Sequence, residues 1–378
     1  MIFPAHLPDE IFFSLLTRMG RMNGFSDFRD MASTYCGDGP VSSFIDAEIN
    51  LSRFSRQTNF AYPGAQELLH HLTWYGAQVK LGEMAWQRIE GLAKGNVGLT
   101  LGTSVFPDSA VLGYCPSCRE CDFQHYGMTY WHRLHQLPIV FFCPIHGDRV
   151  ARVRIKRSFL HKEFPVPGDF ESDQNSSEPK FSLNENFWRG VAVMAAEVLQ
   201  GAELPDADMI FSVMADELRR KRFVPPLSGG RLTALSEQIA EQAFDDSFST
   251  HSPKTVAFLK RIARSFDEPA AGMVLGRIVL LYWLFGGWKA VRERCRWLSV
   301  FGSESDMSMR KVATIRTKLE AQYRRACTAY IKEHPACTRL DFQRAEYRSF
   351  RWLLHNDKIW LDRQLPIPHR GGKQLVLF

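Results

Sequence analysis

The sequence predicts a mainly α-helical protein, with helix-turn-helix-like modules around a small structural zinc finger. Two observations lead to this fold class. Apolar residues recur at spacings of three and four over most of the chain, which is the period of an amphipathic helix. Near the middle of the chain, cysteine and histidine residues form two close pairs of the kind that hold a zinc ion. At 378 residues, with 45% hydrophobic and 23% charged residues, the chain is long enough for two or three globular domains.

The first 105 residues are predicted to form a helical domain. Its first helix follows the acidic Pro8-Asp9-Glu10 and ends at Asn23-Gly24, since both of these last residues tolerate the left-handed conformation of a helix end. Ser26 is the expected cap of a second helix that stops at Gly37. Two short helices joined in this way have the shape of a helix-turn-helix, but an ordinary helical hairpin has the same pattern and stays open as an alternative. Residues 63–94 are expected to be helical again.

Residues 106–165 are predicted to form a zinc-finger domain. Cys115-Pro-Ser-Cys118 and Cys143-Pro-Ile-His146 each hold two ligands with two residues between them, and 24 residues separate the pairs. A tight turn of this kind puts two soft ligands on one side of an ion, and two such turns close a tetrahedron. Zinc accepts mixed thiolate and imidazole ligands. Because Cys115, Cys118, Cys143 and His146 fill all four positions, no position remains for an activated water, and we expect one structural Zn²⁺.

Other side chains near the two pairs are competing candidates for the metal. They are Cys121, His125, His132 and His135. A lone Cys or His in such a stretch is more often packed or solvated than metal-bound, which favours the four-residue set. Replacement of one member by Cys121 or by an intervening His stays open as an alternative.

The second half of the chain is predicted to be a basic helical domain, or two, over residues 181–378. Residues 166–180 are rich in Pro, Gly, Ser, Asn and acids, which is typical of a linker. A second break in the pattern lies at 225–230. Beyond it, helical periodicity predicts the segments 232–248, 253–266, 270–285, 310–332 and 341–354.

Positive charge is concentrated in the last third of the chain. Residues 251–378 hold 24 Lys and Arg against 11 Asp and Glu, whereas residues 1–250 carry net negative charge. This asymmetry indicates a polyanionic partner, because each phosphate that is neutralised releases condensed counterions. The predicted partner is double-stranded DNA, contacted through its phosphates, since nothing in the spacing specifies bases. The candidate contacts are Arg316, Lys318, Arg324, Arg325, Arg344, Arg348 and Arg351.

The last three of these arginines follow one another at spacings of four and three. We expect Arg344, Arg348 and Arg351 to share one face of a single helix over 341–354. The alternative is that the basic residues of this region pair internally, with acids such as Glu346, Asp357 and Asp362.

Composition and motifs argue against membrane, disulfide and enzyme classes. The longest apolar stretch, residues 273–288, is interrupted by Arg277 and two glycines, so it predicts a buried helix and no membrane span. The N-terminus carries acids where a signal peptide would carry lysines, and eight cysteines without a regular framework favour a reducing cytoplasm. We find no catalytic motif such as G-x-S-x-G or H-E-x-x-H and expect a protein that is not an enzyme. A nuclease with scattered acids and a structural zinc stays open as an alternative.

Three segments carry a family resemblance. The chain opens with Pro4, Pro8-Asp9-Glu10, Ser14, Arg18 and Asn23-Gly24; the metal-binding pairs are accompanied by Tyr114, Tyr126-Gly127, Trp131-His132, Leu137-Pro138 and Gly147; and a third segment is Arg351 to Leu361. Together these markers resemble the TniQ/TnsD family of bacterial transposon target-selection proteins. The third segment is similar to one found in the longer TnsD branch, which we favour.

The resemblance implies a protein that marks the insertion site of a multi-component transposon. TnsD-type members bind a chromosomal attachment sequence and recruit the AAA+ regulator TnsC, and the N-terminal part of the family, here around Phe12 to Phe28, contacts that regulator. Shorter TniQ members are recruited by an RNA-guided CRISPR effector complex and often act as homodimers. The basic C-terminal third favours direct DNA binding on the bacterial nucleoid, whereas the chain's length favours the adaptor alternative.

Overall fold

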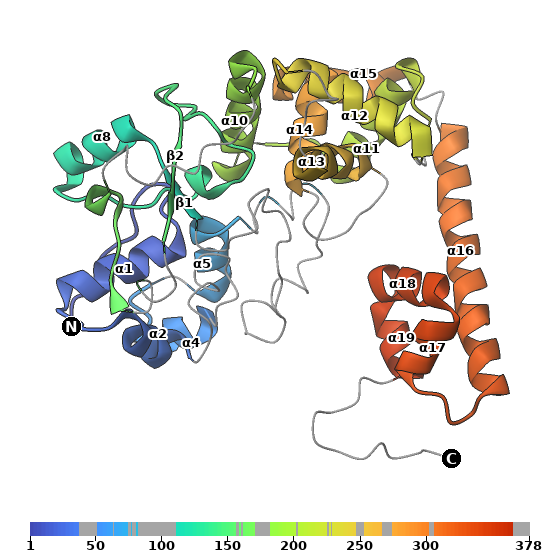
Figure 1. Ribbon diagram of the computed structural model, residues 1–378, viewed down its shortest axis with the longest axis horizontal. Helices are drawn as coiled ribbons and strands as arrows, with labels where there is room; N and C mark the ends of the chain where they lie inside the picture. Colours follow the sequence, from blue (N-terminus) through green and yellow to red (C-terminus); the bar gives the residue numbers. More distant parts are fainter. Residues whose placement is uncertain are drawn as a thin grey trace. The chain divides into compact units, whose positions relative to one another are not determined.

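The computed structural model describes five stretches of the chain: 1–37, 51–81 without 63, 75–76 and 78–80, 111–170 without 156–158 and 160–161, 182–301 without 202, 225–226, 228, 247–252 and 267–273, and 306–365. The predicted mainly helical fold is confirmed (Figure 1). The chain divides into two compact units, Met1–Val300 (unit 1) and Phe301–Phe378 (unit 2). The domain boundaries at 105, 165 and 180 stay predictions. The predicted helical residues 82–94 and most of the predicted linker, 171–180, lie outside the described residues.

Unit 1 begins with helices that pack in sequence order, α1 on α2, α2 on α4 and α4 on α5. They are α1 (Phe12–Met22), α2 (Phe28–Cys36), α4 (Leu51–Gln57) and α5 (Ala65–Leu72). Helix α2 starts one residue later than predicted, because Asp27 and not Ser26 caps it by accepting a hydrogen bond from the Asp30 amide. It ends at Gly37, whose φ of 92° favours glycine. Phe12, Phe13, Phe28 and Phe54 are fully buried among these helices and form the centre of the first core.

The acids that precede α1, as predicted, lie outside its first turn. The Glu10 carboxylate accepts hydrogen bonds from the Leu7 amide at 2.9 Å and from Arg18 at 2.6 Å, inside the protein. Burial raises the pKa of Glu10, against the opposing effect of Arg18. Asp9 turns away from the helix and bonds to the finger. These acids therefore tie the N-terminal segment to its neighbours and do not complement the helix dipole.

The finger contains a small sheet that the sequence did not predict. Strand β1 (Val111–Tyr114) pairs antiparallel with β2 (Ala151–Arg154), with Val111 opposite Arg154 and Tyr114 opposite Ala151. Helix α8 (Pro116–Tyr126) follows β1 directly, and a short 3₁₀ turn, η1 (Leu134–Gln136), contacts the strand. A second 3₁₀ turn, η2 (Pro167–Asp169), follows the sheet.

In the described residues, the rest of unit 1 is a bundle of helices around a second core (Figure 1). They are α10 (Glu185–Leu199), α11 (Ala207–Arg220), α12 (Gly229–Ala243), α13 (Pro253–Arg264), α14 (Val274–Phe285) and α15 (Trp288–Phe301). Helix α14 packs against α10, α11, α12 and α13, as expected of the most apolar stretch of the chain. Its buried Arg277 donates hydrogen bonds to the carbonyl oxygens of Ser265 and Leu81. No helix in the described parts of the chain is long and apolar enough to cross a membrane.

The finger contributes to both cores of unit 1. On one side Leu112, Tyr114 and Trp131 belong to the core of the N-terminal helices. On the other side the segment 137–142 belongs to the core of the α10–α15 bundle, where the rings of Phe141 and Trp188 meet edge to face at 4.7 Å. The finger is therefore packed between two helical modules, and its internal order fixes how they meet.

Unit 2 consists of helices packed around α18. They are α16 (Asp306–Glu333), α17 (Arg339–Ala345), α18 (Tyr347–Asn356) and α19 (Lys358–Gln364). The predicted single helix over 341–354 is wrong, because Glu346 leaves the helical conformation with ψ of 51° and separates α17 from α18. At the start of α17, Thr338 and Asp341 form a reciprocal capping box. Phe342 and Leu353 are fully buried between the helices.

Candidate metal centre

The first metal-binding pair is placed by the start of α8. Cys115 is the N-cap residue, and its sulfur accepts a hydrogen bond from the Cys118 amide at 3.4 Å. Pro116 occupies the first helical position, where the amide hydrogen that it lacks would have no partner. The Cys115 and Cys118 side chains consequently point to the same side of the first turn.

The second pair lies in a tight turn closed by two backbone hydrogen bonds. The Cys143 amide donates to the Asp148 carbonyl at 2.7 Å, and the Gly147 amide donates to the Cys143 carbonyl at 2.8 Å. Gly147 has φ of 75°, a conformation that side-chain-bearing residues rarely adopt. The Asp148 carboxylate accepts hydrogen bonds from both the amide and the hydroxyl of Ser117, which connects this turn to the start of α8.

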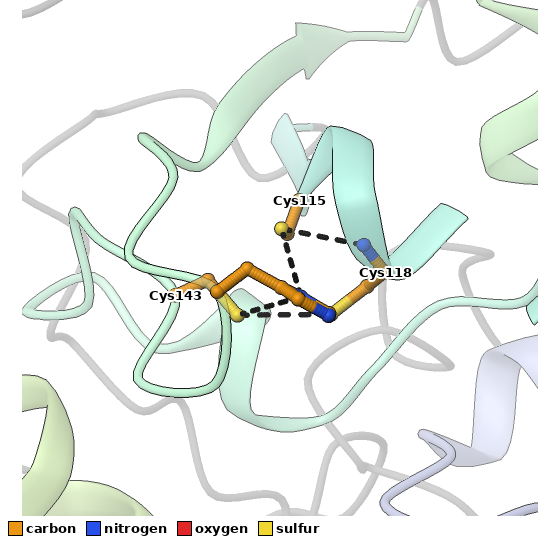
Figure 2. Close-up of side chains that lie close together, drawn as sticks. Cys115, Cys118 and Cys143 are labelled. Atoms are coloured by element: carbon orange, nitrogen blue, oxygen red, sulfur yellow. Dashed lines mark hydrogen bonds between the residues drawn. The ribbon is translucent and has the colours of Figure 1, made fainter. Parts of the chain in front are cut away.

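The four predicted ligands come together in space. The ligand atoms of Cys115, Cys118, Cys143 and His146 all lie within 4.8 Å of one another. His146 Nδ1 is 3.7, 3.2 and 3.8 Å from the sulfurs of Cys115, Cys118 and Cys143 respectively, and the Cys118 and Cys143 sulfurs are 3.6 Å apart. Figure 2 shows the three cysteines facing one another across a small space.

Three of these distances, 3.6, 3.7 and 3.8 Å, match those around a tetrahedral zinc ion, and the other ligand atoms lie close to that arrangement. Bonds of about 2.3 Å to sulfur and about 2.0 Å to nitrogen require ligand atoms roughly 3.5–3.8 Å apart at tetrahedral angles. The three cysteines are buried and His146 is exposed, so the cluster has one side toward solvent. Cys115, Cys118, Cys143 and His146 can hold a metal such as zinc, and with four protein ligands such an ion supplies folding energy.

The pKa values of the three thiols indicate why a cation fits this cluster. Hydrogen bonds from Cys115 and from Cys118 lower the pKa of the Cys143 thiol. The hydrogen bonds of Cys118 with Cys115 and with Cys143, together with burial, raise the pKa of the Cys118 thiol. Without a cation the three crowded sulfurs therefore favour one thiolate that accepts from two thiols. A divalent ion replaces those protons and allows three thiolates in one place.

Two of the competing candidates lie beside the cluster and outside its ligand set. Cys121 Sγ is 3.8 Å from His146 Nε2, on the side of the ring opposite the nitrogen that faces the three cysteines. His125 Nδ1 lies 2.7 Å from the Cys121 carbonyl oxygen, as expected for a hydrogen bond within α8. Cys121 is thus placed to orient the His146 ring.

The two other histidines are buried against the cluster or near it. His132 Nε2 pairs with the Asp122 carboxylate at 2.9 Å, and this hydrogen bond raises the pKa of His132 against the effect of burial. His135 Nε2 lies 3.9 Å from Cys118 Sγ, and burial lowers the pKa of its imidazole. A neutral His135 can donate its Nε2 hydrogen to the sulfur of a bound thiolate, which is a supporting role and not that of a ligand.

A connection that the sequence did not reveal is Arg133. Its buried guanidinium donates to the carbonyl oxygens of His70, Thr73 and Leu199 and to the Asp9 carboxylate. It thereby joins the finger to the N-terminal segment, to α5 and to α10. The position of Arg133 between two histidines is the only sequence signal we recognise for it, and that signal is weak.

The predicted DNA contacts lie in unit 2. Arg325, Arg344, Arg348 and Arg351 are exposed, and Arg351 donates a hydrogen bond to the Tyr347 hydroxyl at 3.4 Å. Arg324 has acidic partners, Glu320 at 2.7 Å and Asp357 at 2.6 Å, so the internal pairing considered as an alternative holds for this residue.

The remaining predictions on these contacts are placed as follows. Arg316 and Lys318 belong to α16, and their side chains lie outside the described residues. Because α17 ends before α18 begins, Arg344 does not share a helix with Arg348 and Arg351, contrary to the prediction.

Comparisons with known proteins agree with this site. Residues 1–149, which contain all four candidate metal ligands, match the family model described as TniQ. The chain is 25% identical over 192 residues to the transposon Tn7 transposition protein TnsD of Escherichia coli, in an alignment that covers 48% of this chain and 37% of that protein. The matched part thus spans little more than a third of the length of that relative. Residues 1–149 are therefore similar to the TniQ family, and about half of the chain is distantly similar to TnsD.

Proposed function

We propose that this protein selects the target site of a multi-component DNA transposon. In this proposal it binds double-stranded target DNA, recruits the AAA+ regulator TnsC and catalyses no step itself. The observation that carries the proposal is the match of residues 1–149 to TniQ together with the distant homology to TnsD. The Zn²⁺ ion in this role is structural, and its ligands are Cys115, Cys118, Cys143 and His146.

The charge of unit 2 supports DNA binding there. Residues 301–378 carry 15 Lys and Arg against 8 Asp and Glu. Arg325, Arg344, Arg348 and Arg351 are exposed on α16, α17 and α18, where a phosphate can approach them. Arg324 is a weaker candidate, since a phosphate would compete with Glu320 and Asp357 for its guanidinium. Contacts of this kind position a duplex and carry no sequence information by themselves.

Replacing Arg344, Arg348 and Arg351 together by Ala is expected to weaken duplex binding. Each phosphate contact that is lost lowers the slope of log affinity against log salt by about 0.9, so three contacts lower it by about 2.7. The measurement is a salt titration of the full chain on duplex fragments from the transposon's target region. Arg56, Arg189 and Arg231 of unit 1, replaced together by Gln, provide a charge-matched control. An unchanged slope in the unit 2 variant would show that this surface is not the DNA footprint.

Recruitment of the regulator is tested separately. The full chain, immobilised, is expected to retain purified TnsC, and exchanging exposed residues of the segment Phe12 to Phe28 is expected to reduce that retention. Met22, which is 42% exposed at the end of α1, is the first residue to exchange, to Asp. If TnsC retention is unchanged after Met22→Asp and after exchange of the other exposed residues of this segment, the regulator contact lies elsewhere.

The adaptor role is the second candidate. The match of residues 1–149 to the TniQ model supports this alternative, in which an RNA-guided CRISPR effector complex recruits the protein, often as a homodimer. Affinity for DNA that depends on the effector complex would support this alternative. Strong binding to one chromosomal site by the protein alone would support target selection by direct contact. Adding magnesium to the same reactions tests the nuclease alternative, since cleavage of the fragments would contradict a non-catalytic role.

A further inference from the structure

Positive charge in the last third of the chain is not confined to unit 2. Residues 251–300, which belong to unit 1, hold 9 Lys and Arg against 3 Asp and Glu. Helix α15 carries several of these cations, and α11 ends in the run Arg219-Arg220-Lys221-Arg222. One cation after a helix C-terminus is explained by the helix dipole, but four in a row exceed what the dipole requires.

The two basic helices meet at one carboxylate. Asp216 of α11 pairs with Arg294 of α15 and lies 3.6 Å from Arg220 Nε, one turn along its own helix. We call the surface around this contact, formed by residues 219–222, Arg294, Arg296 and Trp297, the α11–α15 junction. The junction contains six cations. The acids next to them in the sequence are Asp216, Glu217 and Glu293, so the net charge of this region is +3.

An exposed tryptophan stands within this charge. The Trp297 side chain is 43% exposed, and the Arg294 guanidinium lies 4.3 Å from the centre of its ring. Because Arg294 is also held by Asp216, the indole rests on a fixed support. Arg220, Lys221, Arg222 and Arg296 are also exposed, on or just after the two helices that Asp216 and Arg294 join, and the Lys221 ammonium lies 4.8 Å from the centre of the Trp283 ring.

We propose that the α11–α15 junction binds single-stranded nucleic acid. Cations that follow a phosphate backbone, combined with an aromatic ring on which an unpaired base stacks, are the two features such binding requires. Duplex DNA offers phosphates but no free base face, so Trp297 favours an unpaired strand. An acidic peptide would satisfy the arginines but offers no base to stack on the exposed part of the indole. The inference goes beyond the proposed function, since it concerns another unit and another form of nucleic acid.

The test uses the full chain and a labelled 20-nucleotide oligothymidine. Trp297→Ala is expected to weaken binding by about 5- to 150-fold, the range for losing one base–aromatic stack. Replacing Arg220, Arg222 and Arg296 together by Gln is expected to lower the salt slope by about 2, since each contact with a single strand contributes about 0.7. Arg294 is left intact because it holds Asp216 and the indole in place.

Matched controls separate a local effect from a general one. Tyr126→Ala removes another aromatic ring that is 43% exposed, and the control variant of Arg56, Arg189 and Arg231 removes three arginines of unit 1 outside the junction, two of them exposed and one half-buried. Thermal melts of all variants verify the fold. If both junction variants bind oligothymidine with the same affinity as the control variants, the inference is overturned. An equal loss of duplex and single-strand binding with no effect of Trp297→Ala also overturns it. Failure of the unit 2 arginines in the duplex titration would count against the proposed function alone.

Discussion

Cys143→Ser is expected to remove the metal and to unfold the finger. Serine is a poor zinc ligand, and a structural zinc ion contributes on the order of 10 kcal/mol to the folding of small finger domains at neutral pH. The effect should spread, because Leu112 and Trp131 belong to one core of unit 1 and Phe141 to the other. A loss of only about 5 kcal/mol would already be comparable with the whole stability of many domains. We expect a melting temperature at least about 10 °C lower, measured by circular dichroism.

The matched control for this prediction is Cys337→Ser. Cys337 is a half-buried thiol of unit 2 that has no part in the cluster. Its replacement should leave the melting temperature of unit 1 and the metal content unchanged. If Cys143→Ser melted like the wild-type protein, the cluster would not be a structural centre.

Arg133→Met is expected to destabilise unit 1 by about 3–5 kcal/mol. The guanidinium donates to His70 O at 2.7 Å, to Thr73 and Leu199 O at 3.1 Å each, and to the Asp9 carboxylate at 3.1 Å. Methionine fills a similar volume but leaves these buried acceptors and the carboxylate without their donor, which costs more than the pair itself contributed. Denaturant unfolding followed by circular dichroism measures the change in free energy.

Two control variants show whether the lost stability comes from the hydrogen bonds of Arg133. Arg189→Met removes an arginine of α10 that is 41% exposed, pairs with Glu185 on the same helix and lies 4.8 Å from the centre of the Phe142 ring, so its expected effect is below about 1.5 kcal/mol. Arg133→Lys retains the charge but reaches fewer acceptors and should fall between the two. An effect of Arg133→Met no larger than that of Arg189→Met would mean that this guanidinium does not hold the segments together.

The ligand set was predictable from sequence because metal chemistry is local. A spacing of two residues within a pair indicates that both side chains lie on one side of a tight turn, as in Cys115 with Cys118 and in Cys143 with His146. A Pro after the first Cys of each pair fits that turn. The mainly helical fold was predictable for a similar reason, since helical periodicity is visible within a few turns of chain.

Features that depend on distant contacts were not predictable. Strands β1 and β2 have four residues each, too few for an alternating pattern to stand out, and they pair across 36 residues. The hydrogen bond from Arg133 to the Leu199 carbonyl oxygen likewise depends on how α10 packs, and no local sequence pattern indicates that packing. The break at Glu346 was missed because Arg344, Arg348 and Arg351 keep helical spacing across it, while the backbone does not.

The metal content of the purified protein tests the central claim most directly. The chain is expressed and purified without added metal and without chelators, and its zinc is quantified by elemental mass spectrometry against protein concentration. The account predicts one zinc ion per chain, which Cys143→Ser lacks and Cys337→Ser retains, together with loss of helical signal when a strong chelator removes the ion. A wild-type protein that holds no metal and keeps its full circular dichroism spectrum and melting temperature in chelator would contradict it.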